Sequence, residues 1–264
     1  MATSPDPALE AARQRIASLP VLPVLDPRLP QVLAQTDVDL QYRQLRELLR
    51  VDPALAARVL KVANSAFYGA RSIGSIDRAL TVLGAVAVAG IAMVARFDAT
   101  SASQGRADPA LRQLRRHSLL TAVAARALAA RAGDRLWDPE SAFVLGLLHD
   151  LGWLVGGAVP GAEPAAPGEH ALLSAALFTH WQLPVQFIAA VRDHHGVEPG
   201  AAPGSALLAV AELCSVHAGD EFAARLSPTD AQLALAVFGL SDAELAQLGA
   251  GCAAEAAAID GLVH

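Results

Sequence analysis

The chain has 264 residues, of which 53% are hydrophobic and 17% are charged, and its formal net charge at pH 7 is −6. This composition indicates a globular chain with a sizeable core and excludes a disordered one. Lys61 is the only lysine, and acidic residues outnumber basic ones. Because phosphate neutralisation needs a basic surface, no DNA partner is expected.

The cysteines and the apolar runs indicate the compartment of the protein and whether it enters a membrane. Cys214 and Cys252 form no CxxC motif, and the chain starts without the basic and apolar segments of a signal peptide. The apolar run 79–95 is interrupted by glycines and falls short of a comfortable membrane span, so we expect a buried core helix there. The sequence therefore predicts a cytoplasmic protein with no membrane partner.

Helix signals recur along the chain, whereas strand signals are nearly absent. Four of the aspartate–proline pairs in the chain place a capping carboxylate before a proline suited to the first helical turn. These pairs are Asp6-Pro7, Asp52-Pro53, Asp108-Pro109 and Asp138-Pro139. Two later segments, Thr229-x-x-Gln232 and Ser241-x-x-Glu244, have the capping-box pattern. We therefore predict an all-α fold.

Polar breaks divide this helical chain into two lobes. Segment 101–108 is polar, contains a glycine and follows a long apolar run, so we expect it to be a linker and a hinge. Loops are expected at 156–168 and 196–204, beside several histidines. In chain order, the predicted parts are an N-terminal helical extension at 1–18, a first lobe at 19–100, the linker at 101–108, a second lobe at 109–220, and C-terminal helices at 221–264 that pack on the second lobe.

The pair His149-Asp150 carries two ligand-type side chains at the end of the apolar helical segment 143–152. Adjacent residues on a helix point ~100° apart, so this pair approaches one ion only from a turn or a helix end. Gly152 supplies such an end. Further ligand-type side chains flank the pair at wide spacing: His117, His170, His194, His195 and Glu212. Histidines and carboxylates gathered from several helices are how divalent metal sites in helical proteins are built.

An ordered set of motifs resembles one protein family. The motifs are VDPALAARVLKVANSAFYG at 51–69, IGSIDRALTVLG at 73–84, GLLHDLG at 146–152, HALLSAAL at 170–177, WQLP at 181–184 and HH at 194–195. From about residue 19 to residue 220 they follow the pattern of the HDOD family, the bacterial HD-related output domains. The resemblance implies a two-lobed helical signalling domain with an HD-like second lobe, related to the HD and HD-GYP phosphohydrolases.

The resemblance also implies a set of metal ligands. The basic set of HD enzymes, H…HD…D, corresponds to His117, His149, Asp150 and Glu212, where Glu212 stands in place of the usual aspartate. A second tier resembles the additional ligands of the HD-GYP class; it comprises His170, His194 and His195. The implied cofactor is a divalent metal ion such as iron, manganese or zinc.

Two departures from the enzyme pattern argue against catalysis. Trp153 occupies the position of the lysine in the HDxGK motif, and His195 is followed by Gly-Val-Glu-Pro-Gly in place of the GYP element. No catalytic residue is therefore assigned. We expect a stand-alone regulatory HDOD protein that acts by binding a ligand or a signalling protein partner.

Three alternatives stay open at this point. The first is a metal-dependent HD-type phosphohydrolase acting on a nucleotide or cyclic dinucleotide. The second is a cyclic di-GMP receptor without catalysis. The third is an interaction module whose histidines form a polar core without metal. A receptor would use guanidinium groups on the helix that carries His117. These are Arg112, Arg115 and Arg116. The alternative interpretation of these arginines is that they form a solvent-exposed helix face with no binding role.

Overall fold

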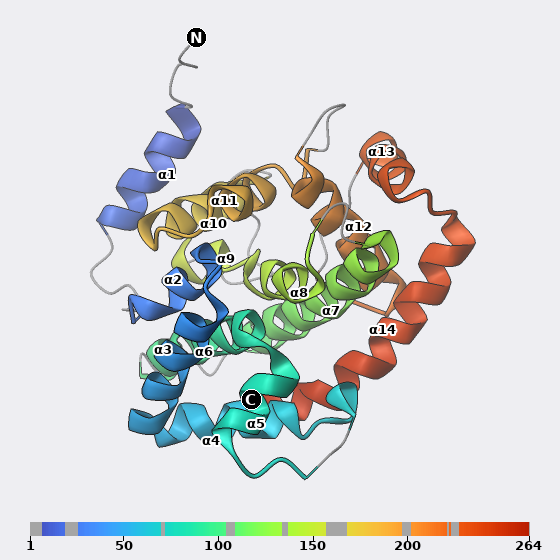
Figure 1. Cartoon of the computed structure of the whole chain (residues 1–264). Coiled ribbons are helices and arrows are strands. Elements are labelled where there is room, and N and C mark those ends of the chain that lie inside the picture. The colour runs from blue at the N-terminus through green and yellow to red at the C-terminus, as the bar shows by residue number, and fades with distance from the viewer. Residues whose placement is uncertain are drawn as a thin grey trace.

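The computed structural model describes residues 7–18, 26–69, 72–103, 109–133, 137–156, 168–196, 202–220, 222 and 227–263. Within these ranges every regular element is a helix, so the predicted all-α fold is confirmed (Figure 1). In chain order the elements are α1 (Pro7–Ala17), α2 (Arg28–Ala34), α3 (Val38–Val51), α4 (Pro53–Ala63), η1 (Ala66–Tyr68), α5 (Ile76–Leu83), α6 (Ala85–Ser103), α7 (Pro109–Ala132), α8 (Pro139–Leu148), α9 (Gly152–Gly156), α10 (Glu169–His180), α11 (Val185–Arg192), α12 (Pro203–His217), α13 (Pro228–Phe238) and α14 (Asp242–Val263).

Most of the predicted helix starts are found at the expected residues. Asp52 and Asp138 cap α4 and α8 by accepting backbone N–H groups, and a proline follows each of them in the first turn. Ser241 forms the predicted capping box, because Glu244 accepts its N–H and its hydroxyl. The Thr229 box is wrong, since α13 begins at Pro228 and Thr229 lies inside its first turn.

The apolar run 79–95 does not form one helix. Gly84 has φ of 79° and ends α5, and α6 leaves it at an angle of 107°. The burial expected for the run is present, because Ala79, Leu80 and Val88 are fully buried. No single described helix is long and apolar enough to cross a membrane, although two sharply bent helix pairs meet that length and composition test together.

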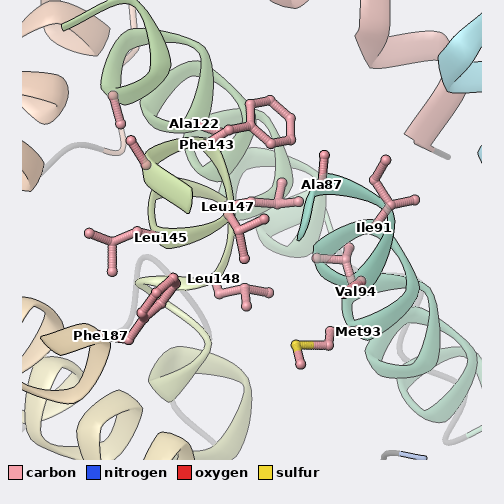
Figure 2. Packing of buried hydrophobic residues seen from close by; sticks show 14 of the residues in the cluster. Ala87, Ile91, Met93, Val94, Ala122, Phe143, Leu145, Leu147, Leu148 and Phe187 are labelled. Atoms are coloured by element: carbon pink, nitrogen blue, oxygen red, sulfur yellow. The ribbon is translucent and has the colours of Figure 1, made fainter. Parts of the chain in front are cut away.

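Helices α7 and α8 form the centre around which the rest is packed (Figure 1). Helix α6 covers α8, while α12 and α14 pack against α7, and α14 also reaches α4 and η1. Figure 2 shows side chains of α6 and α8 meeting in a core that includes Ile91, Leu147 and Leu148. The buried apolar residues form one continuous cluster that includes helices from both predicted lobes.

The predicted linker is helical where the structure describes it. Residues 101–103 belong to the end of α6, and residues 104–108 lie outside the described ranges. The division into lobes and the hinge at this segment therefore stay predictions. The predicted loops at 156–168 and 196–204 also lie mostly outside the described residues, and α12 begins within the second of them at Pro203.

The N-terminal extension packs on the second half of the chain. Helix α1 contacts α10, buries Ile16 at 1% exposure, and pairs Arg15 with Glu169 at the start of α10. The first helix therefore lies beside the segment that carries His170.

The Asn64-Ser65 segment has a structural role at the end of α4. The Asn64 amide donates to the carbonyl of Ile73 at 2.8 Å and accepts the N–H of Ile73 at 2.7 Å. Helix-end chemistry of this kind closes the loop between α4 and α5. The rings of Phe67 and Tyr68 that follow lie beneath the guanidinium of Arg126 on α7.

Gly146 allows α8 to approach α7 closely. A Cβ at this position would lie 2.7 Å from the Cα of Ala122 and 2.8 Å from the carbonyl oxygen of Thr121. Real side chains do not tolerate such contacts with backbone, so only glycine lets the two helices meet here. Because α8 ends two residues later, directly before His149, this contact sets how near His149 lies to His117.

We expect Gly146→Ala to lower the free energy of unfolding by about 2–3 kcal/mol, because the new methyl group must push α8 away from α7. Urea unfolding followed by circular dichroism measures the change. Gly251→Ala is the matched control: position 251 is exposed, lies within α14, and a Cβ there meets nothing within 4 Å. The control should be neutral or stabilising by up to about 1 kcal/mol, and an equal loss in both variants would contradict the close-approach explanation.

Candidate metal centre

The structure brings all seven predicted ligand residues together from five parts of the chain. His117 lies on α7, His149-Asp150 forms the turn between α8 and α9, and Glu212 lies on α12. The second-tier histidines come from the first turn of α10 and the residues that follow α11. Six of the seven are at most 8% exposed, and His195 is half-buried.

One group consists of His117, His149 and Glu212, whose ligand atoms lie within 4.8 Å of one another. The Nε2 atoms of the two histidines are 3.1 Å apart, and Glu212 Oε1 lies 3.7 Å from His149 Nε2. The glutamate therefore reaches the centre despite its longer side chain, since its helix α12 packs against α7.

Asp150 joins this group to a second one. Its Oδ2 lies 3.3 Å from His117 Nε2 and 3.5 Å from His149 Nε2. Its Oδ1 faces the other way, 3.4 Å from His170 Nε2 and 3.7 Å from His194 Nε2. One carboxylate thus lies between two sets of imidazoles.

The second group consists of Asp150, His170, His194 and His195, again with ligand atoms within 4.8 Å of one another. The Nε2 atoms of His170 and His195 are 2.6 Å apart, and His194 Nε2 lies 3.2 Å from Glu212 Oε1. The two groups are therefore continuous, with Asp150 and Glu212 contacting histidines of both.

Gly152 is the reason that Asp150 lies so close to His170. A Cβ at Gly152 would lie 2.0 Å from the carbonyl oxygen of His170, and the Gly152 N–H donates to Ser174 Oγ at 2.9 Å. The start of α9 is thus in direct contact with the backbone of α10. Any other residue at position 152 would separate the two groups of ligands.

Hydrogen bonds fix which nitrogen of each buried imidazole faces the centre. His149 Nδ1 donates to the carbonyl of Gly146 at 2.8 Å, and His194 Nδ1 donates to that of Val191 at 2.6 Å. A carbonyl oxygen only accepts, so Nδ1 carries the hydrogen and Nε2 presents a lone pair. Both Nε2 atoms are therefore in the form that binds a metal ion.

Several acceptor atoms in the centre have no donor. Asp150 Oδ1, His194 Nε2 and both carboxylate oxygens of Glu212 are buried without a hydrogen-bond partner. Unpaired buried acceptors cost several kcal/mol and are rare in folded proteins. Lone pairs that face one another need a proton or a cation between them, and a mixed imidazole and carboxylate set suits iron, manganese or zinc. The residues present therefore fit the implied divalent metal.

Without a metal ion, the pKa values of His117, Asp150 and Glu212 shift in different directions. Burial opposes the charged form of His117, but bonds to Asp150 and Asp220 prevail and raise its pKa to about 10. Burial also disfavours ionised Asp150, but His149 and the other surrounding imidazoles hold the pKa of this carboxyl well below its usual value. Burial raises the pKa of Glu212 well above its usual range. The metal-free centre thus keeps a proton on His117, and burial favours the protonated form of Glu212.

The remaining imidazoles are held neutral. Burial lowers the pKa of His149 to about 4 and that of His195 to about 3, with neighbouring charged groups as smaller contributions. Burial likewise lowers the pKa of His170, and lowers that of His194 well below its usual value. Neutral imidazole is the form that ligates a metal ion at pH 7.

Aromatic rings cover the centre. Trp153 stacks on His170 with ring centroids 4.6 Å apart and an interplanar angle of 16°. Phe222 lies against His117 at 5.1 Å and meets Trp153 edge-on at 5.9 Å. Both covering residues are half-buried. The residue that replaces the HDxGK lysine is thus an apolar cover over a ligand.

The arginines on α7 point away from this centre. Arg112 and Arg116 are exposed, and Arg115 is half-buried. At ~100° per residue, these three positions lie roughly 100° to 160° around the helix from His117. They do not converge with the ligand cluster, and their proposed role in phosphate binding stays a prediction.

Asp220 and Phe222 are the site residues that sequence reasoning missed. Asp220 Oδ2 accepts the Nδ1–H of His117 at 2.7 Å, and both side chains are buried. The only signal in the sequence was a carboxylate directly after Gly219, where helix α12 would end. That pattern suggests a cap or turn as readily as a site.

We expect the metal-free protein to lose stability as the pH falls from 7 to 5. The unfolded chain binds protons on histidine near pH 6.5, whereas folded His149 and His195 stay neutral until the pH falls to about 4 and about 3. The unfolded state therefore binds more protons, and each residue costs about 2 kcal/mol by pH 5. The raised pKa values of His117 and Glu212 act in the opposite sense. The stabilisation from His117 is complete below pH 6.5 and is lost as the pH rises through about 10, and burial of Glu212 costs less as it takes up a proton. Urea midpoints in the presence of a chelator test this, and a midpoint independent of pH would contradict the buried neutral imidazoles.

Comparisons with known proteins agree with this geometry. A model of the HDOD domain matches residues 19–160, more than half of the chain, and a model of the HD domain matches residues 114–237. Among curated proteins, none matches this chain.

Solved structures share the fold. An HDOD domain protein of unknown function from Geobacter sulfurreducens matches with a TM-score of 0.72 and 24% identity over 97% of each chain. A protein provisionally named as a signal transduction protein from Marinobacter aquaeolei VT8 matches with a TM-score of 0.67 and 20% identity, over 97% of this chain and 65% of the other. A protein provisionally named as a metal-dependent phosphohydrolase from Shewanella amazonensis SB2B matches with a TM-score of 0.60 and 18% identity, over 97% of this chain and 98% of the other. The chain belongs to the HDOD family, and the part of it that builds the centre matches the model of the HD domain.

Proposed function

We propose that the chain is a regulatory HDOD protein whose HD centre binds a divalent metal ion as a structural element. On this proposal it acts by binding a signalling protein partner and performs no catalysis. The observation that carries the proposal is the set of buried acceptors without donors, covered by aromatic rings. A site with this many protein ligands, partly covered by aromatic rings, has the character of a structural metal site, since catalytic sites keep a position open for substrate.

The two groups of side chains would each hold one metal ion. Asp150 would contribute one carboxylate oxygen to each group. The first group would hold a metal ion through His117, His149, Asp150 and Glu212, and the second through Asp150, His170, His194 and His195. Each group combines residues from different helices, so metal binding would hold α7, α8, α10 and α12 in one arrangement.

Charge and cysteine chemistry bear on the partner and the compartment of the protein. The net charge of −6 disfavours DNA, as it does other strongly acidic partners. The two cysteines are free and buried, which is the state expected in the reducing cytoplasm, where we place the protein. The cyclic di-GMP receptor alternative has only the α7 arginines in its favour, and they turn away from the centre.

A metal-dependent phosphohydrolase is the second candidate, and one observation favours it. Two ligand groups that both contact Asp150 resemble the two-metal arrangement that clamps the attacking and leaving oxygens in phosphoryl transfer. When bound, such ions lower the pKa of a coordinated water and neutralise phosphate charge. Trp153 weighs against this candidate, because its ring covers His170 on the side where the enzyme pattern has a lysine.

We expect the protein, purified without a tag or chelator, to contain about one to two divalent ions per chain. Asp150→Asn should remove most of this metal, since both groups use that carboxylate. Asp77→Asn, which changes an exposed carboxylate paired with Arg46, should leave the metal content unchanged. His170→Ala and His180→Ala form a second pair on α10, because His170 is buried in the centre and His180 is exposed at the other end of the helix. Elemental analysis of all five proteins tests the proposal, and a folded wild-type protein without metal after incubation with iron, manganese and zinc would refute it.

We expect Trp153→Ala to accelerate the loss of metal to excess chelator by at least about tenfold, because the ring shields the ligands from competing solutes. Trp153→Phe keeps an aromatic ring on His170 and should stay near the wild-type rate. Metal loss is followed by stopped-flow absorbance of a chromogenic chelator. Equal rates in all three proteins would show that Trp153 does not close the centre.

Hydrolysis of bis(p-nitrophenyl) phosphate separates the two candidate functions. We expect metal-loaded wild-type protein to match Asp150→Asn at the background rate. Turnover that requires Asp150 and saturates with substrate would favour the phosphohydrolase over the structural centre, while leaving the metal site itself in place.

A further inference from the structure

Asp220 follows α12 at a sharply defined turn. Gly219 has φ of +81°, and the Asp220 N–H donates to the carbonyl of Ser215 at 3.0 Å, which closes the end of the helix. This turn fixes the backbone from which the carboxylate projects back toward α7. The residue is 8% exposed, so its placement removes a charged group from water.

Both oxygens of the Asp220 carboxylate have donors. Oδ2 accepts the Nδ1–H of His117 at 2.7 Å, and Oδ1 accepts the N–H of Phe222 at 3.0 Å. The ring of Phe222 then packs against His117 with centroids 5.1 Å apart. The imidazole of His117 is therefore held on one edge by a charge-assisted hydrogen bond and on one face by an aromatic ring.

This arrangement treats His117 differently from its neighbours. His149 and His194 donate Nδ1–H to backbone carbonyls, whereas His117 donates to a carboxylate. A carboxylate acceptor places more negative charge behind the ring and makes the opposite nitrogen a better electron donor. That nitrogen, Nε2, lies 3.3 Å from Asp150 Oδ2 and 3.1 Å from His149 Nε2, at the heart of the first group.

We infer that Asp220 is a positioning residue of the metal centre, which holds His117 with Nε2 directed at the ion and strengthens it as a ligand. Asp220 lies outside the H…HD…D pattern, and its carboxylate bonds to Nδ1 of His117, whereas Nε2 of the same ring lies beside Asp150. Its role rests on the proposed metal centre. The segment after α12 thus supplies both an orienting carboxylate and, through Phe222, part of the aromatic cover.

The test compares metal affinity in the full-length wild-type protein, Asp220→Asn and the exposed control Asp242→Asn. Zinc affinity is measured by competition with a chromogenic chelator, and the stability of each metal-free protein is measured by urea unfolding. Asp220→Asn keeps the size of the side chain and a carbonyl acceptor but removes the charge. We expect its zinc affinity to fall by about 10–100-fold while the metal-free protein still unfolds cooperatively, and Asp242→Asn to bind like wild type.

The two proposals fail in different ways. Wild-type protein that binds no zinc, iron or manganese refutes the metal centre and this role for Asp220 together. Wild-type protein that binds zinc, with Asp220→Asn within about twofold of it, refutes the role of Asp220 alone.

A measurement on the wild-type protein covers the case in which Asp220→Asn does not fold. Long-range proton–nitrogen NMR spectra of the zinc-loaded protein report which nitrogen of each imidazole carries hydrogen. We expect hydrogen on Nδ1 of His117 and zinc at Nε2. Hydrogen on Nε2, with Nδ1 bare, would overturn the role of Asp220.

Discussion

Five imidazoles and two carboxylates face one another in a largely buried centre, and the helices that carry them are arranged around that constraint. Moving such groups out of water is costly unless they share protons or a cation. The fold offers little other compensation inside the centre, because both oxygens of Glu212 and one of Asp150 lack donors. The fold supplies its hydrogen bonds around the edge of the centre. Backbone carbonyls and Asp220 accept the Nδ1–H groups of the imidazoles, so that the Nε2 lone pairs converge.

The same constraint explains why helices approach so closely at two glycines. Gly146 lets α8 touch the backbone of α7, and Gly152 lets the start of α9 touch the backbone of α10. Between them lies the turn that carries Asp150, which contacts histidines on both sides. A centre that draws in α7, α8, α10 and α12 makes their relative positions depend on what it binds. Since α6 packs on α8 and α14 reaches α4, the arrangement extends to the first half of the chain. A protein that acts by presenting one shape to a partner can use such a centre without performing chemistry there.

The parts of this structure that local sequence chemistry controls could be predicted. Aspartate–proline pairs and the Ser241 box locate helix starts, and the HDOD resemblance identifies all seven residues that meet in the centre. Other features depend on three-dimensional packing. Gly84 turns an apolar run into two helices because its φ is positive, which composition does not reveal. Asp220 contacts His117 only because the turn after α12 brings it back to α7. The α7 arginines lie outside the site because their positions on the helix face away from His117. Whether Glu212 reaches the centre depended on the packing of α12, and no pattern of spacing could settle that.

The most direct test of the central claim is a crystal structure of the protein loaded with one metal, with anomalous diffraction recorded on both sides of that metal's absorption edge. We expect an anomalous peak between Asp150 and the imidazoles of His117 and His149, with protein side chains filling the coordination sphere beneath Trp153. A well-ordered protein whose centre shows no peak would contradict metal binding. A peak whose coordination is completed by water in an open channel would contradict the closed, structural character proposed for the site.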